Sequence, residues 1–472
     1  MRQISGVLRS RLITVLVLGP LVLMWTVSSP MFSGPDEPDH LVRAQGFTSL
    51  DFSSPYDADG IPVGAVGCYR FKPDVPASCM TLDWREPREE DSRTDGYPPV
   101  LHALSAVPYF FTDGLTATYL VRLWLAMVNT AMVGWALTIA ARRGSWVAIG
   151  ALLTITPTAL FTMGTVNPTG LAVSGSLLVS ASMLDRRGTA KRFESKAALV
   201  TGAILVVGTR RDGAFWFALL LLVLWVALER SIHNDIRHIV RTSRKLMISA
   251  LAVFALSSIW ALQWVYRFLE RRSSAERSAW KAASTLKLYF HQLIGSFGWL
   301  DSPIDWRTLL LAALLCGAVV IAGVRRGNPN QRRAIVLAIA LMVIVPVAFG
   351  AIRYPYFQGR YLLLMWAGLM MIAGSSIEGR SEGRLQSTSL KDCVIGLWVI
   401  VHVWSLITNL KRFSTGRIGS WNIFSDDAWS PPRLGNEVVI AGFAIGGIAM
   451  FFAARAVVRD VLREEHSVAH SG

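Results

Sequence analysis

Twelve long apolar runs constrain what this chain can fold into more than any other feature of its sequence. A helix needs about 20 mostly apolar residues to cross the hydrocarbon core of a bilayer, and the runs have that length or come close to it. They occupy residues 12–30, 119–141, 145–163, 168–184, 197–209, 213–229, 246–267, 307–324, 334–352, 361–377, 392–410 and 437–455. Only 17% of the residues are charged, against about 25% in a soluble domain. These features exclude a soluble globular protein, a disordered tail and a disulfide scaffold.

A thirteenth, weaker run at residues 98–112 follows Tyr97 and contains two prolines at its start. It is better suited to an interfacial or re-entrant segment than to a span. If it does not cross the membrane, the short segments on one side hold 25 of the 47 Lys and Arg residues. Basic residues collect in cytoplasmic loops, so both termini are predicted to be cytoplasmic. The sequence therefore predicts an all-α integral membrane protein with about twelve transmembrane helices and interfacial helices in its first external loop.

The net charge of +15 follows from this topology, so no nucleic-acid partner is expected. Membrane lipid is an expected partner. The predicted segments are the N-terminus with helix 1 (1–30), an external loop (31–118), helices 2–7 (119–267), an external loop (268–306), helices 8–11 (307–410), an external loop (411–436), and helix 12 with the cytoplasmic tail (437–472).

The first external loop contains two cysteines, Cys68 and Cys79, within an acidic stretch. Between residues 31 and 97 there are 13 Asp and Glu against 6 Lys and Arg. Disulfides form in oxidising compartments, and an external loop is exposed to one. We expect a disulfide between the two cysteines; the alternative is that two thiols share the loop by coincidence.

The densest polar cluster follows helix 1 and runs Pro-Asp-Glu-Pro-Asp-His from residue 35 to 40, with Arg43 just beyond. A carboxylate here, at the external membrane–water interface, is placed to serve as a general base toward a hydroxyl group. His40 and Arg43 are placed to offset its charge or to hold a phosphate. The alternative is a solvated turn in which the Asp caps a helix and further acids occupy the first turn.

Two arginine clusters lie near predicted helix ends on the same side. Arg353 and Arg360 flank the entrance of helix 10, where an Arg is costly unless it is paired or binds an anion; the alternative is anchoring at the headgroup level. Arg210 and Arg211 interrupt an apolar stretch just before Asp212. These charges are equally consistent with an ion pair among themselves and with a bound ligand.

Four motifs together resemble a family of bacterial multi-pass membrane proteins of unknown function that is grouped with the GT-C glycosyltransferases. They are Pro35 to His40 with Arg43, Tyr97 to Pro99, Gly298 to Asp301, and Gln358 to Tyr361. The resemblance implies a GT-C-like fold in the bacterial cytoplasmic membrane, with the active site on the external face. It implies that a sugar passes from a polyprenyl-phosphate donor to an envelope glycan or glycolipid acceptor, usually with inversion.

Carried over residue by residue, the resemblance makes Asp36 the general base, with Glu37 as the alternative. It assigns the donor phosphate to His40, Arg43 and Arg360. Secondary site residues are Asp301, Arg353, Arg210, Arg211 and Tyr97. Some relatives hold a divalent metal near the carboxylate, and Asp36, Glu37 and Asp39 could supply oxygen ligands, but nothing in this sequence requires a metal.

Two other functions remain open at this point. A flippase or transporter of a lipid-linked glycan would carry ionisable residues deep in several helices, whereas here the charges gather at helix ends, with Arg122 and Arg210 to Asp212 as the nearest exceptions. A non-catalytic partner of an envelope polysaccharide assembly system would function without the Asp36 carboxylate.

Overall fold

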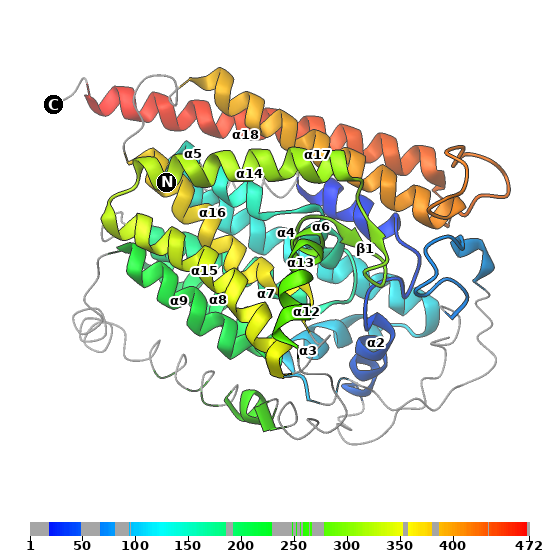
Figure 1. The fold of residues 1–472 in the computed structure, drawn as a ribbon. Coiled ribbons are helices and arrows are strands. Elements are labelled where there is room, and N and C mark those ends of the chain that lie inside the picture. The colour runs from blue at the N-terminus through cyan, green and yellow to red at the C-terminus, as the bar shows by residue number, and fades with distance from the viewer. Residues whose placement is uncertain are drawn as a thin grey trace.

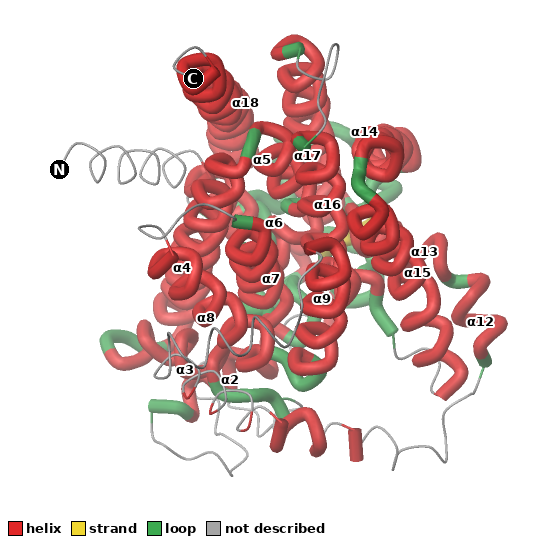
Figure 2. The backbone as a smooth tube through the Cα atoms, turned by 90° about the vertical axis from the view of Figure 1, so that its left-hand side faces the viewer, coloured by secondary structure: helices red, strands yellow, loops and turns green. Residues whose placement is uncertain are grey.

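The computed structural model describes residues 18–48, 67–80, 94, 96–185, 192–228, 278–352, 357–379, 387–432 and 434–469, with isolated positions between 248 and 266. Helices make up most of this part of the chain, as Figures 1 and 2 show. The first described helix is Leu18–Val27. The elements that follow are α2 (Glu37–Gly46), η2 (Ala77–Cys79), α3 (Val100–Ala106), η3 (Val107–Phe110), α4 (Gly114–Arg143), α5 (Ser145–Thr154), α6 (Pro157–Met163), α7 (Pro168–Leu184), α8 (Arg192–Thr209), α9 (Gly213–Leu228), α12 (Ala279–Ser284), α13 (Leu286–Ile294), β1 (Ser296–Phe297), β2 (Ser302–Pro303), α14 (Trp306–Arg326), α15 (Pro329–Ile352), η6 (Gly359–Leu362), α16 (Leu363–Glu378), α17 (Thr388–Thr415) and α18 (Gly435–Ala469).

Helix α16 forms the centre of the bundle. All of its residues from Leu363 to Ile377 are buried, and it packs against α5, α7, α9, α14 and α15. Small residues allow such helices to approach closely. Where α7 meets α8, a Cβ on Gly175 would lie 2.7 Å from the carbonyl oxygen of Gly202, and a Cβ on Gly202 would lie 2.6 Å from that of Gly175. Any larger residue at either position would force the two helices apart.

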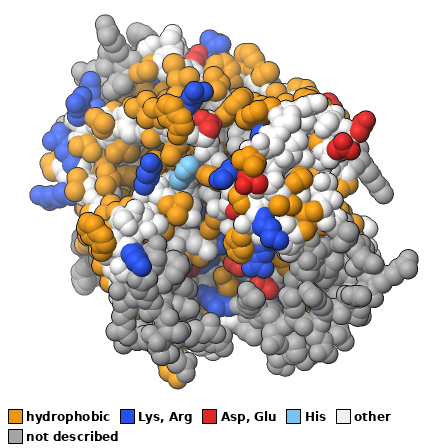
Figure 3. Space-filling model, turned by 45° about the vertical axis from the view of Figure 1, so that its right-hand side comes forward, with side chains coloured by type: hydrophobic (Ala, Val, Ile, Leu, Met, Phe, Trp, Pro, Cys, Tyr) orange, Lys and Arg blue, Asp and Glu red, His pale blue; other side chains and the backbone are white. Residues whose placement is uncertain are grey.

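The outer helices present apolar side chains to the surroundings. On α14, Leu314 is 62% exposed, and Ile445 on α18 is 67% exposed. Figure 3 shows hydrophobic side chains gathered over the upper part of one face of the molecule. In water such a surface would be unfavourable, whereas in lipid it is expected. The protein is therefore a membrane protein, with its polar groups concentrated inside and at the helix ends.

The predicted count of twelve spans is not confirmed. Six helices among the described residues are long and apolar enough to cross a membrane, or seven if α5 and α6 form one bent span. Four further apolar helices have 10–17 residues within the part of the chain that the structure describes: Leu18–Val27, which starts at the first described residue, Val100–Phe110, Pro168–Leu184 and Gly213–Leu228. Half of the predicted run at 246–267 lies outside the described residues.

The run at residues 145–163 forms two helices instead of one straight span. Helices α5 and α6 meet at an angle of 67°. Pro157 lacks a backbone N–H and cannot continue α5, but it fits the first turn of a new helix. The Thr156 side chain caps that helix by accepting a hydrogen bond from the N–H of Ala159. The bend therefore follows from a cap and a proline that are both visible in the sequence.

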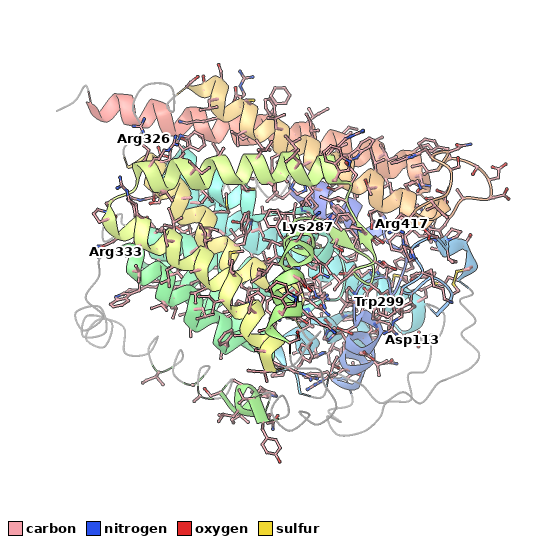
Figure 4. All side chains as sticks on the ribbon, in the orientation of Figure 1. Asp113, Lys287, Trp299, Arg326, Arg333 and Arg417 are labelled. Carbon is pink, nitrogen blue, oxygen red and sulfur yellow. A yellow bond between two sulfur atoms is a disulfide. The ribbon has the colours of Figure 1, made fainter. Side chains whose placement is uncertain are left out.

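The two ends of the bundle differ in chemistry. Figure 4 shows Arg326 and Arg333 at one end of the helices, with Arg417 and Asp113 toward the opposite end. That opposite end also carries α2, α3 and the β1–β2 hairpin (Figure 1). The hairpin pairs Ser296 with Pro303 and Phe297 with Ser302. The polar motifs singled out in the sequence belong to this second end.

Candidate functional site

Asp36 stands at the start of α2 in an unusual backbone conformation. Its φ and ψ are 61° and 11°, in the left-handed region, and its side chain makes no capping hydrogen bond. That region costs most L-residues roughly 1–2 kcal/mol, and Asp is among the few that tolerate it. The carboxylate is 43% exposed. The turn therefore holds the carboxylate out toward solvent instead of placing it on the helix end.

Glu37, the next residue, points into the protein and is fully buried. Its two oxygens accept hydrogen bonds from Nε and Nη2 of Arg122, at 2.7 and 2.6 Å. They also accept hydrogen bonds from the backbone N–H groups of Gly34 (3.1 Å) and Val166 (3.0 Å). The Glu37 carboxylate thereby connects the turn after helix 1 to α4 and to the loop between α6 and α7.

Arg122 completes this buried cluster. It is also fully buried, and it donates to the carbonyl oxygens of Thr26, Ser29 and Pro30. A buried charge is stable only when it is paired and hydrogen-bonded, and Arg122 satisfies both conditions. The backbone that leads from helix 1 into the Asp36 turn is therefore held by one arginine from α4.

Arg360 on η6 faces Asp36. Its Nη2 lies 3.7 Å from Oδ2 of Asp36, and its side chain is only 4% exposed. The Nε and Nη1 groups of this buried arginine have no hydrogen-bond partner among the described residues. An unmatched buried N–H costs about 1–3 kcal/mol, and more when it is charged. The arrangement is therefore suited to an anion placed beside Asp36.

Gly359 sets the position of Arg360 because only glycine fits there. A Cβ at this residue would lie 1.9 Å from the carbonyl oxygen of Tyr289. The backbone N–H of Gly359 donates to Oε1 of Gln292 at 2.7 Å. Helix α13 therefore fixes the 3-10 turn that carries Arg360, and the two elements pack against each other.

His40 lies inside the site, against a second histidine that the sequence analysis did not select. Its Nδ1 is 3.1 Å from Nε2 of His102 on α3, and its ring meets the edge of Tyr97 with centroids 5.0 Å apart. Burial lowers the pKa of His40 well below its usual value, and the positive charges of nearby arginines, above all Arg211 and Arg360, lower it further. His40 is therefore neutral at pH 7.

His102 shares this environment. Burial lowers the pKa of its ring, and the neighbouring His40 and Arg43 lower it further. No sequence motif that we recognised includes His102, although it lies only three residues beyond Pro99. Two neutral rings in contact provide hydrogen bonds inside the site without adding charge.

Arg43 holds the protein's own backbone. Its guanidinium donates to the carbonyl oxygen of Thr94 and, at 3.1 Å, to that of Tyr97. The Thr94 hydroxyl in turn donates to the carbonyl oxygen of Asp39. Arg43 therefore fixes the turn at 94–97 against α2, and this places Tyr97 beside His40.

Arg210 and Arg211 behave differently from each other. Arg210 forms a two-pronged pair with Asp212, at 2.8 and 2.7 Å, and donates to Oγ1 of Thr169. Its guanidinium lies 4.4 Å from the ring centroid of Tyr361, and that of Arg211 lies 4.4 Å from the centroid of Tyr97. Arg210 is therefore paired within its own segment, and the charges of both arginines help to lower the pKa of His40.

These observations bring four distant segments to one place: residues 36–43, 97–102, 210–212 and 360–361. A sequence profile shows which protein family contains this chain. The profile described as "Predicted membrane protein (DUF2142)" matches residues 20–366, which span most of the chain and all four segments. The protein belongs to the DUF2142 family.

Solved structures and curated proteins add little to this assignment. Two structures of ArnT from Cupriavidus metallidurans are similar to this DUF2142 chain, one in the apo state and one bound to undecaprenyl phosphate. Their identities are 14% and 15% and their TM-scores are 0.48 and 0.49, over 94% of this chain and 75% and 76% of theirs. No curated protein matches the chain.

The remaining predicted residues lie apart from the Asp36–Arg360 pair or outside the described residues of this DUF2142 protein. Asp301 pairs with Nη2 of Arg412 at 3.2 Å, and Arg412 also donates to carbonyl oxygens of the loop that the Cys68–Cys79 disulfide closes. Asp301 therefore helps to anchor that loop. Arg353 lies outside the described residues.

The described residues do not provide a metal site. No group of three or more His, Cys, Asp or Glu gathers among them in a way that would hold an ion. The carboxylate of Glu37, one of the ligands considered from the sequence, is fully occupied by Arg122 and two backbone N–H groups.

The two neutral histidines predict a pH-dependent stability. In the unfolded chain each ring binds a proton near pH 6.5, but in the folded protein the lowered pKa values keep both rings neutral there. The unfolded state then binds more protons, so stability is lost as the pH falls through about 6.5. We expect Tm in detergent to fall between about pH 7.5 and pH 5.5. The fall should be smaller in a His40→Gln, His102→Gln variant; an unchanged pH profile in that variant would refute the assignment.

Proposed function

We propose that this protein is a membrane glycosyltransferase that transfers a sugar from a polyprenyl-phosphate-linked donor to an envelope glycan or glycolipid acceptor. One observation carries the proposal. An exposed carboxylate, Asp36, lies 3.7 Å from a buried arginine, Arg360, whose Nε and Nη1 groups have no partner among the described residues. A base next to a cation that can hold a phosphate is what transfer from a phosphate-linked donor requires. The motif resemblance supports the same chemistry.

In the proposed reaction, Asp36 accepts the proton of an acceptor hydroxyl as the oxygen attacks the anomeric carbon of the donor sugar. The bond between that carbon and the phosphate oxygen breaks, and the phosphate departs with the electron pair. Arg360 donates to the departing phosphate, and its positive charge stabilises the negative charge that develops there. Attack from the side opposite the leaving group inverts the configuration at the anomeric carbon.

Geometry supports Asp36 over Glu37 as the base. The Glu37 side chain is fully buried and its oxygens accept four hydrogen bonds, so an acceptor hydroxyl has no route to it. Asp36 is exposed and its side chain caps no helix. In this proposal Glu37 and Arg43 are structural residues, and His40 acts as a neutral hydrogen-bonding group instead of a cation for the phosphate.

The wider setting belongs to the same proposal. We place the protein in the bacterial cytoplasmic membrane with a GT-C-like arrangement of about twelve spans. Both termini face the cytoplasm in this proposal, and the Asp36 turn faces outward. The basic end of the bundle supports that orientation, since it carries Arg325, Arg326, Arg332 and Arg333 on the connection between α14 and α15, and such clusters favour the cytoplasmic side.

Replacing Arg360 tests the phosphate site. In Arg360→Gln, we expect the donor to bind roughly 10- to 100-fold more weakly, because hydrogen bonds to a charged group contribute about 1.5–3 kcal/mol. Arg360→Lys should recover part of the lost donor affinity, since lysine keeps the positive charge but lacks the planar set of N–H donors of a guanidinium group. The measurement is binding and transfer of polyprenyl-phosphate sugars by purified protein in nanodiscs. Arg325→Gln, at the other end of the bundle, serves as the control; equal donor binding by Arg360→Gln and this control would overturn the assignment.

A further inference from the structure

A second polar site lies away from the Asp36 turn, between the ends of α14 and α17. A groove with a volume of about 750 Å³ opens there, lined by the first turns of α14, the last turns of α17 and the loop that follows α17. Its size is within the usual range for sites that bind small molecules, about 300–1,000 Å³. None of its lining residues belongs to the Asp36–Arg360 cluster, so the proposed transfer reaction does not use it.

Three tryptophans form the aromatic part of the groove. Trp306 is 66% exposed, Trp404 42% and Trp421 59%. The rings of Trp404 and Trp421 stack, with centroids 5.9 Å apart and planes 26° apart. Tryptophan is enriched where a membrane meets water. Farther from these helix ends, toward the middle of the bundle, α14 and α17 expose apolar side chains, among them Leu314 (62%) and Ile400 (56%). The groove therefore continues into the surface that faces lipid.

The rim of the groove is positively charged. Arg307 has no ion-pair partner among the described residues, and Arg417 has only a loose, exposed one, Asp74, at 3.6 Å. Such an exposed pair contributes little. Lys411 donates to the carbonyl oxygens of Gly416 and Arg417, and these bonds hold Arg417 at the rim.

The acid in the groove does not cancel this charge. Asp305 caps α14 by accepting hydrogen bonds from the backbone N–H groups of Arg307 and Thr308, and it accepts a further bond from Nε1 of Trp404. Its oxygens are therefore directed at the protein. With Arg307, Lys411 and Arg417 against the committed carboxylate of Asp305 and the loosely paired Asp74, the groove retains a surplus of positive charge.

We propose that this groove binds an anionic phospholipid from the leaflet at this end of the bundle. The phosphate lies among Arg307, Lys411 and Arg417, the glycerol region lies against the tryptophans, and an acyl chain follows the exposed apolar residues of α14 and α17. Basic side chains near a membrane surface attract anionic lipids by about fivefold in affinity each. The groove also borders Arg412, which anchors the disulfide loop. The bound lipid therefore lies next to the arginine that holds this loop in place.

The test uses tryptophan fluorescence of the full chain in phosphatidylcholine vesicles. A fraction of the lipid is replaced by dibrominated phosphatidylglycerol or by dibrominated phosphatidylcholine, whose acyl bromines quench nearby indoles. The contribution of Trp404 and Trp421 is obtained by subtracting the signal of a Trp404→Phe, Trp421→Phe variant. We expect the anionic lipid to quench this contribution at a several-fold lower fraction than the zwitterionic lipid.

Charge variants decide whether the groove is responsible. Arg307→Gln with Arg417→Gln should lower the preference for the anionic lipid by about fivefold for each arginine removed; both side chains are exposed, so folding, followed by Tm, should be kept. Arg325→Gln with Arg326→Gln, at the other end of α14, should keep the preference. Equal quenching by both lipids in the wild type would reduce the groove to an aromatic anchor. A preference that survives in the first variant, or that disappears equally in both, would also overturn the proposal.

Discussion

Replacing Asp36 by Asn is expected to lower the rate of sugar transfer by about 10²–10⁴-fold, the usual contribution of a positioned general base. Donor binding should change little, because Arg360 and the rest of the anion site stay in place. The measurement is product formation by purified protein in nanodiscs with a panel of polyprenyl-phosphate sugars and host envelope extract. Asp113→Asn is the matched control, since Asp113 is also an exposed acid at the N-cap position of a helix at this end of the bundle, and its side chain makes no capping hydrogen bond.

The outcomes separate the three functions considered from the sequence. Transfer by the wild type that is lost in Asp36→Asn but kept in Asp113→Asn supports the enzyme and identifies its base. Transfer that persists in Asp36→Asn rejects Asp36 as the base. If the wild type consumes no donor at all, the transferase is replaced by one of the other two functions, a flippase or a non-catalytic assembly partner. The flippase is then tested by following the movement of a labelled lipid-linked glycan across the vesicle membrane.

Breaking the buried Glu37–Arg122 pair should have the largest effect on stability. Glu37→Gln leaves the Arg122 guanidinium buried without a counter-charge, and Arg122→Gln leaves the carboxylate in the same condition. Removing one partner of a buried pair costs about 3–5 kcal/mol. We expect a clearly lower Tm in detergent for both variants, together with loss of transfer, because Arg122 also holds the backbone that leads to Asp36.

The control for this prediction is Arg142→Gln. Arg142 also forms an arginine–glutamate pair, with Glu194 at 2.7 Å, but the two side chains are 11% and 21% exposed. Solvent near that pair reduces its contribution, so its loss should lower Tm much less. The double variant Glu37→Gln, Arg122→Gln should be less destabilised than the sum of the single variants. Equal Tm values for Glu37→Gln and Arg142→Gln would contradict the structural role of the buried pair.

The helices could largely be predicted from the sequence, because their determinants are local. Apolar runs delimit α4, α7, α9 and α14, and the charged break at residues 210–212 correctly separates α8 from α9. Pro157 and the Thr156 cap mark the bend between α5 and α6, although we predicted one span there. The motif residues at 36–43, 97 and 360 were selected from the sequence, and the structure places them near one another at one end of the bundle; their roles in a site stay a prediction.

Roles within that group could not be predicted, because they depend on which helices pack together. Asp36 and Glu37 are neighbours with the same functional group, yet one is exposed and the other is buried against Arg122, 85 residues away in the chain. His102 lacks a motif, and its contact with His40 exists only because α3 packs on α2.

The sequence by itself determined that this is a helical membrane protein whose polar motifs sit at helix ends, since hydropathy and proline positions act over a few residues. Only the tertiary structure decided which of two adjacent carboxylates is exposed, and that Nε and Nη1 of Arg360 have no hydrogen-bond partner among the described residues. The physical reason is that burial and charge compensation are properties of the packed bundle. A residue's partner comes from segments that are distant in the chain, and no local pattern records it.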